Sequence, residues 1–399
     1  MNVMKNFFLL LALTAWSNAA LAQSLQGTLW DIPALYRAPA SRVLQKDSAI
    51  ALVYQGLPYH GHQQEVFAWY ATPGTLSGDT SKDHHLPGIV LVHGGGGAAF
   101  REWAIMWAQR GFAAIAMDLR GNGPDRKHLP LGFEEPGNET PYFDVTLPLQ
   151  EQWMYHAVAN VLLAHQLLRS FPAVDTNRTA LTGISWGGVI TCTVAGLDPR
   201  FRAAVPVYGC GYLGESGRMR TQLKALTEAQ RHTWLTQYDP SQYIGKAAMP
   251  MLFVNGTNDP HFEMESYART CALVKHQQQC IKPGMKHSHK YGWANAEISA
   301  FINSYVNDSL PLPAIGQLSR HGGYYRALIT TGTPILKSDM HYTTDTAGVA
   351  AQWKSMEVKV NKKQLQIPLP PAGATAWFIS VEDERGMYIS GPLQHQFLK

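Results

Sequence analysis

Charged residues are sparse in this chain of 399 residues: Asp, Glu, Lys and Arg together make up 16%, and the formal net charge is +4. No block of like charges occurs, so neither nucleic acid nor an anionic membrane is expected as a partner. Internal repeats and low-complexity tracts are also missing, while 45% of the residues are hydrophobic. This composition is typical of a globular protein, and the length favours two domains.

Cysteine is scarce as well, and its spacing argues against a thiolate metal site. All four cysteines lie after residue 190, at Cys192, Cys210, Cys271 and Cys280. No CxxC pair with zinc-finger spacing occurs, so no metal is expected on these thiols. Cys192 and Cys210 lie in segments that are expected to belong to the hydrophobic core. Cys271 and Cys280 are close enough in sequence for a disulfide between a helix end and the next strand, which export would permit.

The first residues have the pattern of an export signal. Lys5 supplies a positive charge, residues 7–16 form a short apolar stretch, and Ala20 to Ala22 gives a small-x-small cleavage pattern. The stretch is too short to span a bilayer, and no cysteine follows it to carry a lipid. The alternative is an ordinary first helix. We expect a signal peptide at 1–22, cleavage near Ala22, and a periplasmic or secreted protein.

Strand and helix patterns alternate between residues 88 and 304. The expected strands lie at 87–92, 111–117, 179–184, 203–208 and 250–255, and the longest expected helices at 149–170 and 262–276. Continuous apolar strands separated by helices indicate a mostly parallel sheet with helices on both faces, the α/β class. Antiparallel strands at 50–54 and 65–70 are expected to lead into it.

The pattern changes after the Leu-Pro-Leu-Pro segment at 310–313. Helical periodicity disappears, and short alternating runs are separated by Pro and Gly turns. Short alternating runs of this kind predict a small all-β sandwich. We therefore expect an α/β domain with an N-terminal β extension at 23–312 and a C-terminal β-sandwich domain at 313–399.

The strongest chemical signal is the sequence GISWGG at 183–188. A serine hydroxyl is a poor nucleophile unless it is held where a base can take its proton. A sharp turn between a strand and a helix does this, and it needs flanking glycines because a Cβ there would meet the neighbouring backbone. The motif follows an expected strand and opens a helix of small residues, as a nucleophile elbow does. Ser185 is the candidate nucleophile; the alternative is a tight turn without chemistry.

A second glycine-rich segment, HGGGG at 93–97, directly follows the strand at 87–92. Glycines allow backbone N–H groups to approach a developing oxyanion. A phosphate-cradling loop is the alternative, but no Lys-Ser/Thr follows the glycines and no GxGxxG occurs with a later acidic residue. His93 is expected to brace this loop rather than to act as a base. The expected oxyanion donors are Gly94, Gly95, Gly96 and Trp186.

An acid and a base follow Ser185 along the chain. Asp259 comes after the strand at 250–255, and His287 and His289 follow a short strand at 280–282. Serine, aspartate and histidine in this order are used by serine hydrolases built on a parallel sheet. We favour His287 as the base, with His289 as the alternative; the other histidine would line the pocket or hold the loop. A metal at the His-x-His pair would need further ligands that the sequence does not single out, so none is expected.

Together these motifs resemble the acetyl xylan esterase and dienelactone-hydrolase-like branch of the α/β-hydrolase superfamily. HGGGG, RGFAAIAMDLRGNG, GISWGG, NGTNDP and KHSHKYGW carry the resemblance over about residues 45–308, and the tail is similar to the β-domain of some exported bacterial esterases. The resemblance implies an α/β-hydrolase fold, a triad of Ser185, Asp259 and His287, and cofactor-free hydrolysis of carboxylic esters, often acetyl groups on plant polysaccharides. Trp186 departs from the Gln usual in the family's xylan deacetylases, and the run of four glycines departs from their oxyanion loop.

The expected function is therefore that of a serine esterase acting on a small-molecule or carbohydrate ester, in an oligomeric state that the sequence does not reveal. Two alternatives remain: a serine peptidase of the prolyl-oligopeptidase type, and a catalytically silent glycan-binding protein. The peptidase should carry a large gating domain, for which the distance from leader to first strand leaves no room. The long irregular insertion at 121–142 is expected to border the pocket. Possible pocket residues are His289, His93, Tyr208 and Trp293.

Overall fold

The computed structural model describes residues 28–133, 140–345 and 348–395. The expected signal peptide lies outside these described residues. Within them, no helix has both the length and the apolar character needed to cross a membrane.

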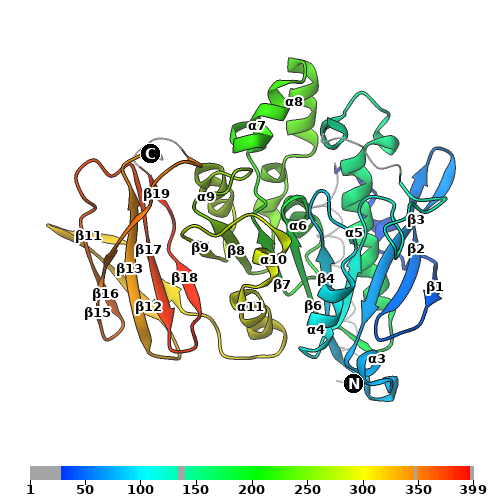
Figure 1. Ribbon diagram of the computed structural model, residues 1–399, viewed down its shortest axis with the longest axis horizontal. Helices are drawn as coiled ribbons and strands as arrows, with labels where there is room; N and C mark the ends of the chain where they lie inside the picture. Colours follow the sequence, from blue (N-terminus) through cyan, green and yellow to red (C-terminus); the bar gives the residue numbers. More distant parts are fainter. Residues whose placement is uncertain (1–27, 134–139, 346–347, 396–399) are drawn as a thin grey trace, which may run out of the picture.

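A mostly parallel sheet forms the centre of the molecule (Figure 1). Its first nine strands are β1 (Ser41–Gln45), β2 (Ile50–Tyr59), β3 (His62–Ala71), β4 (Leu86–Val92), β5 (Ala113–Met117), β6 (Val174–Ile184), β7 (Ala203–Val207), β8 (Met251–Gly256) and β9 (Gln277–Lys282). Their spatial order is β1-β2-β3-β5-β4-β6-β7-β8-β9. The pairs β1–β2, β2–β3 and β3–β5 are antiparallel, and every later pair is parallel. The predicted α/β class with an antiparallel N-terminal extension is confirmed.

Helices connect the strands and cover the sheet. They are α2 (Ile32–Leu35), α3 (Pro73–Ser77), α4 (Arg101–Ala108), α5 (Trp153–Ser170), α6 (Trp186–Leu197), α7 (Gly217–Lys224), α8 (Glu228–Gln237), α9 (Met264–Ala272), α10 (His289–Trp293) and α11 (Ala296–Val306). The helix expected over 149–170 starts instead at Trp153, after a short 3-10 turn. No pattern in the sequence indicated α7 and α8, because both helices are polar and bury few side chains.

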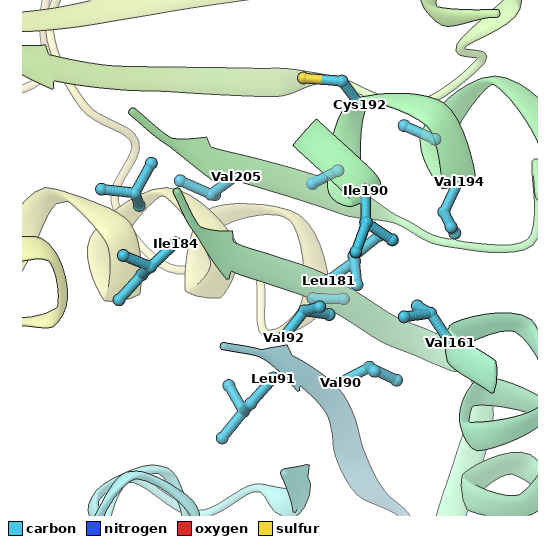
Figure 2. Packing of buried hydrophobic residues seen from close by; sticks show 14 of the residues in the cluster. Val90, Leu91, Val92, Val161, Leu181, Ile184, Ile190, Cys192, Val194 and Val205 are labelled. Carbon is cyan, nitrogen blue, oxygen red and sulfur yellow. The ribbon is translucent and has the colours of Figure 1, made fainter. Parts of the chain in front are cut away.

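The core consists of apolar side chains on both faces of the central strands. In Figure 2, Val90 and Leu181 point toward α5 and α6, while Leu91 and Ile184 point to the opposite side of their strands. All four side chains are buried. Successive strand residues face opposite sides, so a strand covered on both faces must be apolar throughout. This explains why these strands were visible in the sequence as continuous apolar runs.

The C-terminal residues form antiparallel strands in two sheets. These strands are β10 (Ala314–Ile315), β11 (Ser319–His321), β12 (Tyr324–Thr330), β13 (Ile335–Thr343), β14 (Lys354–Glu357), β15 (Lys359–Asn361), β16 (Gln364–Pro368), β17 (Ala376–Asp383), β18 (Tyr388–Ser390) and β19 (Gln394–His395). One sheet has the order β10-β12-β16-β15, with β11 beside β12. The other, β18-β17-β13-β14, continues the central sheet, because β18 pairs with β9. The all-β class expected after residue 313 is confirmed; the domain boundary at 312 stays a prediction.

All four cysteines are free thiols buried in the core. The sequence left open a disulfide between Cys271 and Cys280, and the structure does not form it. Cys271 lies on α9 and Cys280 on β9, and both side chains are buried.

Candidate active site

Ser185 occupies a sharp turn between β6 and α6. Its φ of 59° and ψ of −119° form a strained combination for a residue with a side chain. The turn depends on close backbone approaches at the glycines on either side. A Cβ on Gly183 would lie 2.2 Å from the oxygen of Gly187, and a Cβ on Gly187 would lie 2.0 Å from the oxygen of Val92. The local geometry is that of the nucleophile elbow expected from GISWGG.

The structure brings Ser185, His287 and Asp259 together at the carboxyl ends of β6, β9 and β8. Nε2 of His287 lies 2.9 Å from Oγ of Ser185, and its Nδ1 lies 2.7 Å from Oδ2 of Asp259. The second carboxylate oxygen of Asp259 accepts the backbone N–H groups of His261 (2.8 Å) and Phe262 (2.9 Å). A carboxylate opposite Nδ1 selects the tautomer that carries its proton there, which leaves Nε2 free to accept the serine proton.

Tyr208 packs against the ring of His287. Their rings lie 4.4 Å apart between centroids at an angle of 35°. The Tyr208 hydroxyl donates a hydrogen bond of 2.8 Å to the carbonyl of Lys286, the residue before His287. Burial raises the pKa of Tyr208, so its hydroxyl stays a donor. We expected Tyr208 as a possible pocket residue. The structure corrects this, because its side chain is fully buried, with the ring against His287 and the hydroxyl bonded to Lys286.

The glycine loop at 93–97 turns tightly beside Ser185. The N–H of Gly97 donates to the carbonyl of Gly94 at 3.0 Å, and Gly96 has a φ of 68°, a left-handed conformation that glycine adopts freely. The N–H of Gly94 donates to Nε2 of His289 at 3.0 Å. Gly94 was expected as an oxyanion donor, but its N–H is already committed to this histidine. Among the described residues, the N–H groups of Gly95 and Gly96 have no such acceptor.

His289 therefore bonds to the glycine loop, whereas His287 bonds to Ser185. Burial, together with the neighbouring His93 and His287, lowers the pKa of His289 to about 4. The ring is neutral at neutral pH, which allows Nε2 to accept the Gly94 N–H. Of the two histidines considered as the base, the structure puts His287 next to Ser185.

His93 braces the same loop from inside the protein. Its Nδ1 donates to the carbonyl of Gly94 at 2.7 Å, and its Nε2 accepts the N–H of Leu119 at 3.0 Å. The side chain is buried, with both nitrogens used by backbone groups, so its proposed place among the pocket residues is corrected. Trp293 is half-buried and packs against Phe100 and Trp103, with centroids 5.3 and 5.7 Å apart.

Trp186 opens α6 directly after Ser185. As the first residue of the helix, it has a backbone N–H without an intrahelical acceptor. Its side chain is buried between Tyr142, Phe143 and Trp153, whose ring centroids lie 4.9, 5.3 and 5.6 Å away. A Cβ on Gly95 would lie 2.7 Å from the Trp186 ring, so the glycine loop rests on this indole.

Tyr142 and Phe143 lie next to Trp186, and no sequence pattern singled them out. The sequence predicted only that the insertion at 121–142 would border the pocket. The described end of that insertion does reach Trp186, and residues 134–139 lie outside the description. No periodicity marks these two aromatics, because they lie in a 3-10 helix of only four residues, Thr140–Phe143. In the part of the chain that the structure describes, no group of three or more His, Cys, Asp or Glu is arranged to hold a metal ion.

Comparisons with known proteins support the α/β-hydrolase fold. Among solved structures, an acetyl xylan esterase from Paenibacillus sp. R4 is similar with a TM-score of 0.56 and 20% identity, covering 69% of this chain and 92% of that one. Acetyl xylan esterase 1 from Thermoanaerobacterium sp. JW/SL YS485 is similar with a TM-score of 0.53 and 15% identity, covering 70% and 95%. At these identities the likeness shows the fold alone.

A curated relative, the uncharacterized peptidase YuxL of Bacillus subtilis (strain 168), is 23% identical over 227 residues. The match covers 53% of this chain but only 31% of YuxL, so the chain spans about a third of that relative's length. The family model for acetyl xylan esterase (AXE1) matches residues 38–252. The match includes Ser185 and the glycine loop and ends before Asp259 and His287. Since it covers more than half of the 399 residues, this chain belongs to the acetyl xylan esterase family of α/β hydrolases.

Proposed function

We propose that the protein is a serine carboxylic-ester hydrolase in which Ser185 is the nucleophile, His287 the general base and Asp259 the residue that orients the base. One observation carries the proposal: the unbroken line of contacts from Ser185 Oγ through His287 to Asp259, at 2.9 and 2.7 Å. Such a line activates a hydroxyl that is otherwise a weak nucleophile.

In the proposed reaction, Nε2 of His287 takes the Ser185 proton as Oγ attacks the ester carbonyl. The N–H of Trp186 and an N–H of the glycine loop at Gly95 or Gly96 stabilise the oxyanion, and loss of one such donor costs about 10²-fold or more in rate. His287 then protonates the leaving alcohol. Water, activated by the same histidine, releases the acyl group. The chemistry needs no cofactor.

The proposed substrate is an acetyl ester of a small or carbohydrate alcohol, in a periplasmic or secreted enzyme. Membership of the acetyl xylan esterase family supports the acetyl group. The signal pattern at 1–22 supports export.

The test compares wild type with Ser185→Ala on acetyl, butyryl and feruloyl esters and on acetylated xylo-oligosaccharides. We expect Ser185→Ala to lose about 10⁴-fold or more in kcat. Ser309→Ala, at an exposed serine, is the matched control and should keep wild-type activity. A fluorophosphonate should label wild type at Ser185 and leave Ser185→Ala unlabelled. A wild-type protein that is neither labelled nor active on any ester would overturn the proposal and favour the silent glycan-binding alternative.

A peptidase remains the second candidate, favoured by the similarity to the uncharacterized peptidase YuxL of Bacillus subtilis. Parallel assays with aminoacyl-proline anilides and acyl nitrophenyl esters separate the two activities. We expect the ester to be cleaved faster; faster cleavage of the anilide would replace the esterase proposal with the peptidase.

A further inference from the structure

The side chain of Asn258, next to Asp259, is held by the C-terminal loop that joins β13 to β14. Its Nδ2 donates to the carbonyl of Val349 at 2.9 Å and to that of Ala351 at 2.8 Å. These two carbonyls belong to the segment between β13 and β14, more than 90 residues further along the chain. A primary amide has two N–H donors. Both are used here, so the two bonds determine the orientation of the side chain.

The same asparagine is connected to the segment that carries His287. The hydroxyl of Thr257 donates to Oδ1 of Asn258 at 2.7 Å, and its oxygen accepts the N–H of Gly284 at 3.1 Å. Gly284 lies between β9 and His287. A continuous set of hydrogen bonds therefore joins the C-terminal segment, the Asp259 loop and the His287 loop.

A second set of contacts supports the strand that leads to His287. Oγ of Ser390 accepts the N–H of Ile281 at 3.1 Å, and the hydroxyl of Tyr388 donates to the carbonyl of Ile281 at 3.0 Å. Both partners lie on β18, which pairs with β9. Without β18, β9 would be an edge strand with these polar groups unpaired.

Apolar packing joins the same elements. Ile281 of β9 forms a buried cluster with three C-terminal side chains, against which residues of α9 pack. The cluster members are Ile281, Ala376, Phe378 and Leu393, with Met264, Ala268 and Trp353 against them. The α9 helix follows the Asp259 loop, and β9 precedes the His287 loop. The C-terminal strands thus contact α9 and β9, the two elements next to the loops of the candidate acid and base.

We propose that the C-terminal strands are a positioning element of the active site, and that Asn258 is the positioning residue through which they act on Asp259. This inference rests on the proposed function of Ser185, His287 and Asp259. Asn258 contacts no reacting atom. It holds the backbone from which Asp259 projects, and so sets the angle at which the carboxylate meets His287. Misplacement of a catalytic group by about 1 Å can cost 10²-fold in rate, so such a hold matters for turnover.

Three variants of the full-length protein test the proposal. Asn258→Ala removes the amide. Asn258→Asp keeps the size of the side chain but places a carboxylate, which cannot donate, against the two carbonyl oxygens. Asn258→Gln keeps the two N–H donors. We expect kcat to fall about tenfold or more for the Ala and Asp variants, with KM within about twofold, because acid and base are misaligned while the pocket is intact. Asn258→Gln should keep a third or more of wild-type kcat. Asn361→Ala, at an exposed position on β15, is the matched control and should match wild type.

Rates are normalised to the number of sites that a fluorophosphonate labels at completion, so that unfolded protein is not counted. Ser390→Ala weakens the support of β9 at a second point, and we expect it to lower kcat in the same direction. The proposal is overturned if the Ala and Asp variants at 258 keep wild-type kcat, if their loss disappears on normalisation, or if it lies in KM alone. Unchanged Asn258 variants with an inactive Ser185→Ala would overturn this inference only. An inactive, unlabelled wild type would instead overturn the proposed function.

Discussion

Gly94 donates its backbone N–H to Nε2 of His289 at 3.0 Å, across 195 positions of sequence. The contact ties the glycine loop after β4 to the first residue of α10. It also separates the roles of two neighbouring histidines: His287 contacts Ser185, and His289 contacts the loop that faces it. In the proposed reaction, both of these segments border the ester carbonyl.

Replacing His289 should therefore slow the reaction without removing the base. His289→Ala leaves the Gly94 N–H without its acceptor and the loop less well held, and we expect kcat to fall about tenfold. His289→Gln keeps a side-chain acceptor and should retain more activity than the alanine variant. His287→Ala should be far more severe than either. Steady-state kinetics on an acetyl ester measure all three, and equal losses for the two histidine-to-alanine variants would contradict the separation of roles.

The low pKa of His289 predicts a stability that depends on pH. Its pKa is about 4 in the folded protein and about 6.5 in an unfolded chain. Between these values the unfolded chain binds a proton that the native protein does not. The stabilisation is therefore complete above about pH 6.5 and is lost as the pH falls toward 4. The free energy of unfolding, measured with urea, should fall more steeply with decreasing pH for wild type than for His289→Gln over this window. The difference in slope should be up to about 1.4 kcal/mol per pH unit. Parallel pH profiles for the two proteins would contradict the assignment.

Tyr208→Phe tests the support beneath His287. The substitution keeps the ring against the imidazole but removes the hydroxyl that donates to the Lys286 carbonyl. Loss of one buried hydrogen bond costs about 1 kcal/mol of stability, and the looser histidine should lower kcat about threefold to tenfold. Tyr305→Phe, at the exposed edge of α11, is the control for removal of a hydroxyl. A Tyr208→Phe enzyme with wild-type kcat would show that the stacked ring alone positions the base.

Two glycine-to-alanine variants should differ sharply in stability. At Gly187 a Cβ would lie 2.0 Å from the Val92 oxygen, so backbone must move at the nucleophile turn. At Gly245 the nearest atom to an added Cβ is the Leu273 oxygen, at 3.8 Å, which is ordinary contact. We expect Gly187→Ala to lose about 3 kcal/mol or more, the range of severe core overpacking, and Gly245→Ala to change stability by less than about 1 kcal/mol. Thermal unfolding measures both, and equal melting temperatures would contradict the close approach at the turn.

The free cysteines predict a simple thiol titration. All four are buried, and burial raises the pKa of each thiol. Ellman's reagent should therefore react with none of them in the native protein and with all four after denaturation without reductant. A reductant should leave the melting temperature unchanged. Detection of only two thiols in the denatured protein would indicate a disulfide.

Local patterns in the sequence were sufficient for much of the fold and for the candidate nucleophile. The strands around Val90 and Leu181 are covered on both faces, so their buried parts are mostly apolar and the run is visible without any knowledge of its neighbours. The turn at Ser185 needs glycines at fixed offsets because the clash that they avoid lies within a few residues. The polar helices α7 and α8 escaped prediction because they bury few side chains and carry no comparable signal.

By itself, the sequence determined the α/β class, the all-β C-terminal part, the elbow at Ser185 and the order of the candidate acid and base. Only the tertiary structure decided that His287 and not His289 meets Ser185, that Gly94 is already bonded, and that Asn258 joins the C-terminal strands to the site. A turn or a buried strand is specified by contacts between near neighbours in the chain. Which of two adjacent histidines faces the serine, or which carbonyl accepts a distant amide, depends on how separate loops pack in space.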